Sequence, residues 1–327
     1  MKKIVMGLAI SGLLFACHAD RRLFKEAQLA TSQGNLVQAI DIYSRLVKQE
    51  PENFAAFINR GVLWERLPVK DARERYSNRQ KAAQDYLKAI EANPYSAEAY
   101  NNLGALYIDI KRYSDAIDYL SSALSLQPNY FTARMNRAIV SYRTGRIVEA
   151  LEDFNLAARI RPHDPLLLLN RGLAYYDMGH YESAAEDFSY LIHLNPDNAR
   201  AYLERAKVFI KMGYPYNAYT DLEEAVTIKP SYALAYYYMG DLMFRKGEKD
   251  MALGLLVKSK ELANKYAPTY DLMGDMLAVE DPTAAVANYI VAKKLDPKNA
   301  KRYESKIQLM QSEEGRERVQ ANRFFPR

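Results

Sequence analysis

Residues 97–130 read AEAYNNLGALYIDIKRYSDAIDYLSSALSLQPNY and contain the two halves of a helical hairpin. In the first half, Tyr100, Leu103 and Tyr107 recur at helical spacing, which predicts an amphipathic helix. A polar turn follows, and the second half carries small and apolar side chains on one face until Pro128 prevents the helix from continuing. Such a hairpin is too small to bury its own apolar face, so it must pack against further structure.

Three series of residues recur along the chain with the same period of 34 residues. A proline follows each second helix, an alanine marks its apolar face, and a small residue marks each first helix. The members are Pro94, Pro128, Pro162, Pro196 and Pro230; Ala116, Ala150, Ala184, Ala218 and Ala252; and Gly104, Ala138, Gly172, Ala206 and Gly240. An uninterrupted period of this length predicts a row of stacked helical hairpins.

One copy of the repeat reads Leu168-x₂-Arg171-Gly172-x₂-Tyr175, then Ala184-x₃-Phe188, then Pro196. This pattern resembles the tetratricopeptide repeat, W-x₂-L-G-x₂-Y, A-x₃-F and P, with Tyr, Arg or Leu where the family often has Trp. The resemblance implies an all-α fold, a right-handed solenoid of about eight helix-turn-helix repeats with a C-terminal capping helix. It also implies protein or peptide partners.

We expect five segments: a signal peptide at 1–16, a lipidated N-terminus at 17–19, the solenoid at 20–298, a capping helix at 299–318 and a frayed tail at 319–327. The repeats are expected near 20–51, 54–94, 97–128, 131–162, 165–196, 199–230, 233–264 and 266–297. The second repeat exceeds the period by nine residues, which predicts an elongated second helix after Asp71. Its basic residues either bind an acidic partner or form a solvated extension; they are Lys70, Arg73, Arg75, Arg79 and Lys81.

The first 17 residues, MKKIVMGLAISGLLFAC, have the features of an export signal. Their uncharged run is 14 residues long, whereas a membrane-spanning helix needs about 20. The run ends Leu14-Phe15-Ala16-Cys17, which resembles the lipobox of bacterial lipoproteins. The resemblance implies that Cys17 carries lipid and anchors an exported protein to a membrane. His18, in place of Asp, implies the outer membrane facing the periplasm if the organism has two membranes. An ordinary leader with an incidental cysteine is the alternative.

No catalytic constellation is recognisable in the sequence. The histidines lack metal-ligand spacing, and no phosphate-binding loop, nucleophile elbow or H-E-x-x-H motif occurs. Acidic pairs such as Glu186 and Asp187 are interpreted as solvated charge. With 45 basic and 40 acidic residues, the chain has a mixed surface rather than one typical of nucleic-acid binding. We therefore expect a non-enzymatic protein with no metal, no cofactor and no nucleic-acid partner.

The concave groove of a solenoid is lined by first helices, and one groove position holds asparagine in four consecutive repeats. These are Asn59, Asn102, Asn136 and Asn170, followed by Glu204 and Tyr238. A side-chain amide both donates and accepts, so it can pair with the backbone of an extended peptide. The series resembles the asparagine ladder in the repeat domain of O-linked N-acetylglucosamine transferases, which holds substrate peptides. Alternatively, these amides cap or bridge neighbouring helices.

Two further series are expected beside the asparagines. One is Met135, Leu169, Leu203 and Tyr237, and the other is Tyr142, Tyr176, Ile210 and Phe244. They either contact side chains of a bound segment or pack adjacent first helices together. We therefore expect a scaffold or adaptor of the bacterial cell envelope that binds extended peptide segments. A pilotin-like assembly factor, a self-associating spacer without a peptide ligand, and a regulatory subunit of a glycosyltransferase are the alternatives.

Overall fold

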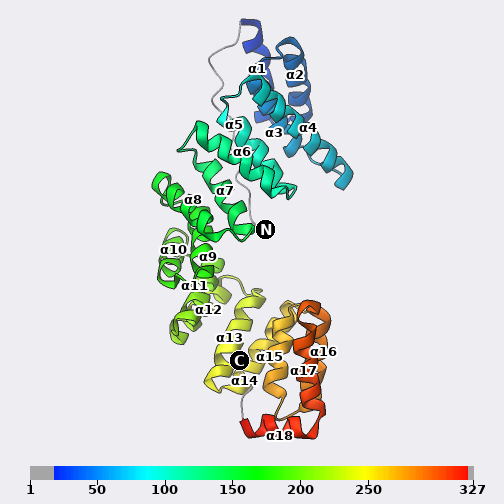
Figure 1. Cartoon of the computed structure of the whole chain (residues 1–327), viewed down its shortest axis with the longest axis vertical. Helices are drawn as coiled ribbons and strands as arrows, with labels where there is room; N and C mark the ends of the chain where they lie inside the picture. Colours follow the sequence, from blue (N-terminus) through cyan, green and yellow to red (C-terminus); the bar gives the residue numbers. More distant parts are fainter. Residues whose placement is uncertain (1–17, 323–327) are drawn as a thin grey trace. The chain divides into compact units, whose positions relative to one another are not determined.

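The computed structural model describes residues 18–322, which form α-helices joined by short turns (Figure 1). The predicted Cys17 lipidation site and signal peptide lie outside the described residues. The first helices of the hairpins are α1 (His18–Ser32), α3 (Phe54–Arg66), α5 (Ala97–Asp109), α7 (Phe131–Arg143), α9 (Pro165–Asp177), α11 (Ala199–Met212), α13 (Ala233–Lys246) and α15 (Ala267–Leu277). The second helices are α2 (Leu36–Gln49), α4 (Ala72–Ala92), α6 (Tyr113–Leu126), α8 (Ile147–Ile160), α10 (Tyr181–Leu194), α12 (Pro215–Ile228), α14 (Lys249–Leu262) and α16 (Pro282–Leu295). The prediction of an all-α repeat solenoid is confirmed.

The chain divides into two compact units between Met178 and Gly179. Unit 1 contains α1 to α9, and unit 2 contains the helices from α10 onward. The expected solenoid of residues 20–298 therefore consists of two compact units, each with its own core.

Short polar residues begin several of the first helices. The side chain of Ser96 accepts a hydrogen bond from the backbone N–H of Ala99, and Asn53 and Asn198 accept equivalent bonds at α3 and α11. Asp164 caps α9 directly before Pro165, the first helical residue. These side chains satisfy N–H groups that have no partner within the helix, so they define where each repeat starts.

The two helices of a hairpin meet at a small residue. A Cβ atom added to Gly104 would lie 2.7 Å from Cγ of Leu120 on α6, too close for any side chain. One large side chain of the second helix then fills the hairpin interior: Tyr86, Phe154 and Tyr289 are all fully buried. This packing explains the alternation of small and large residues in the repeat.

The helix α4 has 21 residues, whereas α6 and α8 have 14. Asp71 caps it by accepting from the backbone N–H of Glu74, and its first turns extend beyond the neighbouring helices in Figure 1. Arg79 pairs with Asp109, and the Lys81 ammonium lies 4.2 Å from the ring centroid of Trp64. Two of the five basic residues, Arg79 and Lys81, thus hold the extension against the neighbouring helices α5 and α3.

The C-terminal end differs from the expected single capping helix and frayed tail. After the short 3₁₀ turn η1 (Pro297–Asn299), the chain forms α17 (Ala300–Gln311) and α18 (Glu313–Asn322), separated at Ser312. Val319 is buried in a cluster with Met310, so part of the predicted tail is helical and packed. The apolar side of α18 has a partner surface, which explains why the helix continues past Arg318. No helix within 18–322 is long and apolar enough to span a bilayer.

Candidate functional site

The first helices form the inner layer of each unit. In unit 1, α5 contacts both α3 and α7, and α7 contacts α9, while successive second helices approach one another less closely. Closer spacing on one side curves a stack of hairpins toward that side, so the first helices line the concave surface. The inner face of unit 1 is defined here as Asn59, Glu98, Asn102, Asp109, Asn136, Tyr142, Leu166, Leu169, Asn170, Leu173, Tyr176 and Asp177.

The four asparagines of the predicted ladder do not form one continuous row. Asn136 on α7 donates to Oδ1 of Asn101 on α5 at 3.2 Å, and Asn101 donates to Oδ1 of Asn102 at 3.1 Å. Asn59 and Asn170 instead donate to backbone carbonyl oxygens of their own helices, at 2.8 and 2.7 Å. The structure therefore links Asn102 with Asn136 through a third amide. Sequence reasoning missed Asn101, although its place beside Asn102 was the available signal.

Burial limits what these amides can contact. Asn136 is 0% exposed, Asn170 2% and Asn102 4%, whereas Asn59 is half-buried. The bond from Asn136 to Asn101 joins α7 to α5 and satisfies two of these buried groups, while the Nδ2 atom of Asn102 has no acceptor within the described residues. Of the two roles considered for the series, this arrangement favours bridging of neighbouring helices. Peptide binding by the amides stays a prediction that requires them to be uncovered.

The predicted apolar series separates into core and surface. Met135 and Leu203 are fully buried in the cores of unit 1 and unit 2, so the expectation that they line an accessible groove is wrong for this structure. Adjacent first helices pack at this position, which removes the side chains from solvent. Leu169 is half-buried on the inner face of unit 1.

The predicted tyrosines are all partly exposed. On unit 1, the Tyr142 hydroxyl donates to the carboxylate of Asp177, and Tyr176 is half-buried. On unit 2, Tyr237 meets Tyr238 and Tyr266 edge to face, with ring centroids 5.2 and 5.3 Å apart. The predicted groove residues therefore belong to two surfaces, one on each unit.

A repeated ion pair joins the helices of a hairpin and was missed in the sequence. Arg205 on α11 binds Asp221 on α12 through two hydrogen bonds of 2.8 and 2.7 Å, and its Nη1 donates to Ser189 on α10. The same arrangement joins Arg137 to Asp153 and Ser121, and Arg60 to Asp85 and Ser44. The signal was an Arg and an Asp 16 residues apart at Arg137–Asp153 and at Arg205–Asp221, and 25 residues apart at Arg60–Asp85, where the second repeat is nine residues longer.

The interpretation of Asp187 as solvated charge is wrong. This carboxylate is 5% exposed and occupies the same repeat position as Asp153 and Asp221. A buried carboxylate requires hydrogen-bonded cationic or polar partners, so charge at this position belongs to the packing of the repeat.

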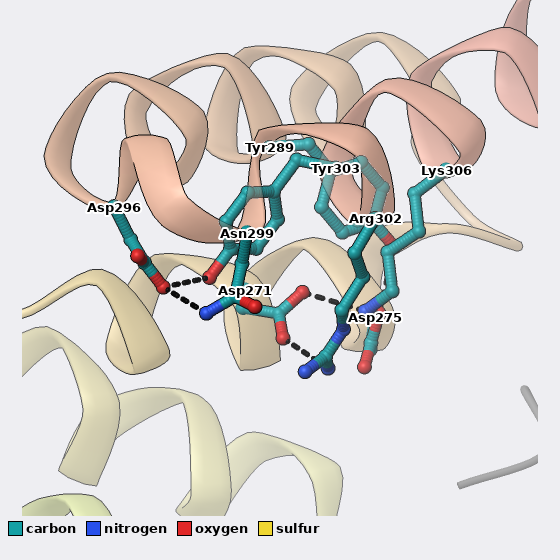
Figure 2. A network of polar contacts seen from close by, with 8 residues as sticks. All are labelled: Asp271, Asp275, Tyr289, Asp296, Asn299, Arg302, Tyr303 and Lys306. Carbon is teal, nitrogen blue, oxygen red and sulfur yellow. Dashed lines mark hydrogen bonds and ion pairs between the residues drawn. The ribbon is translucent and has the colours of Figure 1, made fainter.

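A second polar network fixes α17 at the end of unit 2 (Figure 2). Arg302 donates to Asp271 at 2.6 Å, and Lys306 binds both Asp271 and Asp275. The Tyr289 hydroxyl donates to Asp275 at 2.9 Å. Each carboxylate has a cation, so this cluster is a structural closure of the last repeat rather than a reactive site. No group of three metal-ligating side chains occurs in the described part of the chain.

One inner-face carboxylate lacks such compensation. Glu98 in the first turn of α5 is half-buried, and within residues 18–322 it makes no hydrogen bond and no ion pair. Burial raises its pKa because the charged form loses water. Its charge contributes, after burial, to the rise of the Tyr130 pKa to about 12.

Comparison with known proteins identifies the repeats. Tetratricopeptide repeat models match residues 23–53, 97–130 and 199–232, and a TPR repeat model matches 172–213. Tetratricopeptide repeat protein 6 of Homo sapiens is 37% identical over 83 residues, which are 25% of this chain and 14% of that protein. The chain spans about 15% of the length of the curated relatives it first matches.

Solved structures of similar fold include a tetratricopeptide repeat protein from Parabacteroides merdae, 21% identical with a TM-score of 0.54, covering 76% of this chain and 94% of that one. YrrB, described as a TPR protein with an unusual peptide-binding site, is 21% identical with a TM-score of 0.52 and covers 58% of this chain and 98% of its own. At these identities the likeness shows the fold. The matched stretches of this chain are tetratricopeptide repeats, and its stacked hairpins have the fold of a tetratricopeptide-repeat solenoid.

Proposed function

We propose that this chain is a non-enzymatic protein-interaction scaffold that holds an extended segment of a partner against the inner face of unit 1. Tetratricopeptide repeats generally mediate contacts between proteins, and the concave surface of a solenoid is the extended surface available for them. A peptide-binding site is named for YrrB, which has this fold. The proposal concerns where a segment binds here and which side chains contact it.

The observation that carries the proposal is an apolar stripe on α9. Leu166, Leu169, Leu173 and Tyr176 are all half-buried, and their spacing of three, four and three residues places them on one helix face. Equivalent residues of α7, Met135 and Ile139, are fully buried. The stripe therefore leaves apolar area in contact with water at the inner face, and an extended segment would cover it with a gain in free energy.

The test is a capture experiment with matched surface variants. Full-length protein is compared with Leu169→Asp on the inner face and Val148→Asp at the start of α8, where Val148 is 55% exposed on a second helix. Both variants add one negative charge to an apolar position. The proposal predicts a partner that is retained by the wild type and Val148→Asp but lost by Leu169→Asp, while all three keep the same helix content and melting temperature.

Other results would contradict the proposal. Equal capture by all three proteins would move the binding site away from α9, with the basic first turns of α4 as the next surface to vary. Absence of any partner, together with a mass that rises with protein concentration, would favour the self-associating spacer.

The predicted lipid anchor is part of the proposal for where the scaffold acts. Cys17 would tether unit 1 to a membrane of the cell envelope, because α1 begins at the next residue, His18. Cys17→Ser is expected to release the protein from membranes, and the intact mass of the wild type should exceed the mass of the polypeptide by that of a lipid. A wild type without added lipid mass, together with a variant that stays bound, would rule out this anchor.

A further inference from the structure

The inner face of unit 1 contains an acidic side chain placed to select the charge of a bound segment. Glu98 lies four residues before Asn102 and eleven before Asp109, so the three side chains occupy one face of α5. Gly104, which packs against Leu120 of α6, lies on the opposite face. Glu98 therefore borders the surface on which the proposed segment would lie.

The other inner-face and adjoining acids of unit 1 have partners. Asp109 is paired with Arg79, Asp177 accepts a hydrogen bond from the Tyr142 hydroxyl, and Glu65 accepts one from the Tyr86 hydroxyl. Glu98 has none among residues 18–322, and no cationic side chain there offsets the effect of burial on its pKa. A half-buried carboxylate without a partner raises the free energy of the unbound protein.

A second unsatisfied group lies one helical turn away. The Nδ2 atom of Asn102 is buried and has no acceptor within the described residues, although Asn102 Oδ1 accepts from Asn101. This Asn102 donor is buried and cannot be satisfied by a cationic side chain, which offers donors only. The half-buried Glu98 carboxylate is therefore the inner-face group that can accept a hydrogen bond from a bound segment.

The half-buried Glu98 carboxylate suits a long cationic side chain, because the methylene groups of lysine and arginine can be covered by protein while the charged end reaches the acid. A cation placed here would form a charge-assisted hydrogen bond with Glu98, which is stronger than one from a neutral donor.

We infer that Glu98 determines the specificity of the inner face by pairing with a lysine or arginine of the bound segment. The inference rests on the proposed function, since it presupposes a segment on the inner face, and it adds the chemical class of that segment. The partner is an extended peptide with a basic residue for Glu98 and, farther along, apolar residues for the α9 stripe, because α7 lies between α5 and α9 in the layer of first helices.

The inference is tested with a displayed library of random twelve-residue peptides. The library is selected separately on the full-length wild type, on Glu98→Gln, and on Glu152→Gln as a control. Gln keeps the size and hydrogen-bonding atoms of Glu98 but removes its charge, and Glu152 is an exposed acid on α8. Lysine or arginine should be enriched at one position of peptides selected by the wild type and Glu152→Gln, and not by Glu98→Gln.

The selected peptide is then compared with its norleucine version by fluorescence anisotropy. Replacement of the basic residue should weaken binding to the wild type about tenfold or more, and should have little effect with Glu98→Gln. Peptides enriched without a basic residue, or an equal loss with Glu98→Gln, would overturn the role of Glu98 and leave peptide binding intact. Absence of any enriched peptide would refute the proposed function as well.

Discussion

At the scale of single residues, the hairpin turns require a positive φ angle, which glycine adopts easily and a residue with a side chain does not. Five turns contain a glycine with φ between 77° and 93°: Gly34, Gly145, Gly179, Gly213 and Gly247. Lys111 occupies the corresponding turn between α5 and α6 with φ 65°. A side chain in this left-handed region costs about 1–2 kcal/mol, which glycine avoids. The turn after α5 is therefore strained where its relatives are not.

The change Lys111→Gly is expected to stabilise unit 1. Relief of the left-handed conformation gains about 1–2 kcal/mol, while the greater freedom of glycine in the unfolded chain costs about 0.5–1 kcal/mol. The net gain should be roughly 0.5 kcal/mol and should raise the urea midpoint. Gly145→Lys, at the equivalent turn, should lower it. A lower midpoint for Lys111→Gly would show that its side chain makes a contact that outweighs the strain.

The buried carboxyl of Glu65 makes stability depend on pH. Burial raises its pKa from 4.5 to about 7, although the Tyr86 hydroxyl and the charge of Arg79 oppose that rise. Between these values the unfolded state loses the proton and the folded state keeps it, so the folded state is favoured most below pH 4.5 and loses this advantage as pH rises to about 7. The Tyr86 hydroxyl is fixed as the donor, since its own pKa is raised by burial.

Glu65→Gln should remove this part of the pH dependence. The urea midpoint of the wild type is expected to fall from pH 4 to pH 8 by more than that of the variant, because glutamine has no proton to lose. Glu152→Gln, an exposed change on α8, should retain the wild-type dependence. Identical slopes for all three proteins would mean that Glu65 titrates at its ordinary pKa.

At the scale of elements, the repeated Arg–Asp pair sets how a first helix sits between two second helices. Arg205 contacts Asp221 on α12 and Ser189 on α10, and the two partners belong to successive hairpins. Apolar packing alone allows helices to slide, whereas a guanidinium held by a bidentate carboxylate and a hydroxyl specifies one register. This arrangement of Arg, Asp and Ser recurs in several hairpins, and it uses other residues than those that define the repeat pattern.

Arg205→Ala is expected to destabilise unit 2 by about 3 kcal/mol, because it leaves the buried Asp221 carboxylate without a cation. The double variant Arg205→Met with Asp221→Leu should regain most of that loss, because no charge then remains buried. Chemical denaturation of the three proteins measures both effects. A double variant no more stable than Arg205→Ala would show that the ion pair contributes net stability beyond packing.

At the scale of the whole molecule, stability is expected to be local. Each hairpin contacts mainly its neighbours, and the contacts separate into two units at Met178 and Gly179. In a stack of repeats, free energy is approximately a sum over units and nearest-neighbour interfaces. A destabilising substitution in one unit should therefore leave the protection of backbone amides against hydrogen exchange in the other unit largely unchanged.

Gly104→Val tests this separation. The added side chain would collide with Leu120 and with the Ala116 carbonyl oxygen, so α5 and α6 cannot keep their distance. Overpacking of this kind typically costs about 1–3 kcal/mol. Hydrogen exchange should accelerate in α3 to α8 and remain near wild type in α12 to α16. Equal acceleration in both units would show that the chain unfolds as one cooperative body.

Much of the fold follows from local pattern, while the site does not. The 34-residue period predicts paired helices and their small contact residues, because these depend on residues within one hairpin or its neighbour. The break at Ser312 and the packing of Val319 were missed. A helical pattern in the sequence does not show where packing against residues farther along the chain interrupts or extends a helix.

In the groove, too, the sequence predicted some features and only the tertiary structure decided the others. The sequence predicted which residues share a repeat position, and it left two roles open for Asn59, Asn102, Asn136 and Asn170: peptide binding in the groove or bridging of neighbouring helices. It did not show that they are buried, that Asn101 links two of them, or that Met135 and Leu203 belong to cores while Leu169 reaches the surface. Those outcomes depend on how closely successive first helices approach, which is set by packing between hairpins. The missing partner of Glu98 is likewise a property of the surrounding side chains, because charge compensation depends on distances that no repeat pattern contains.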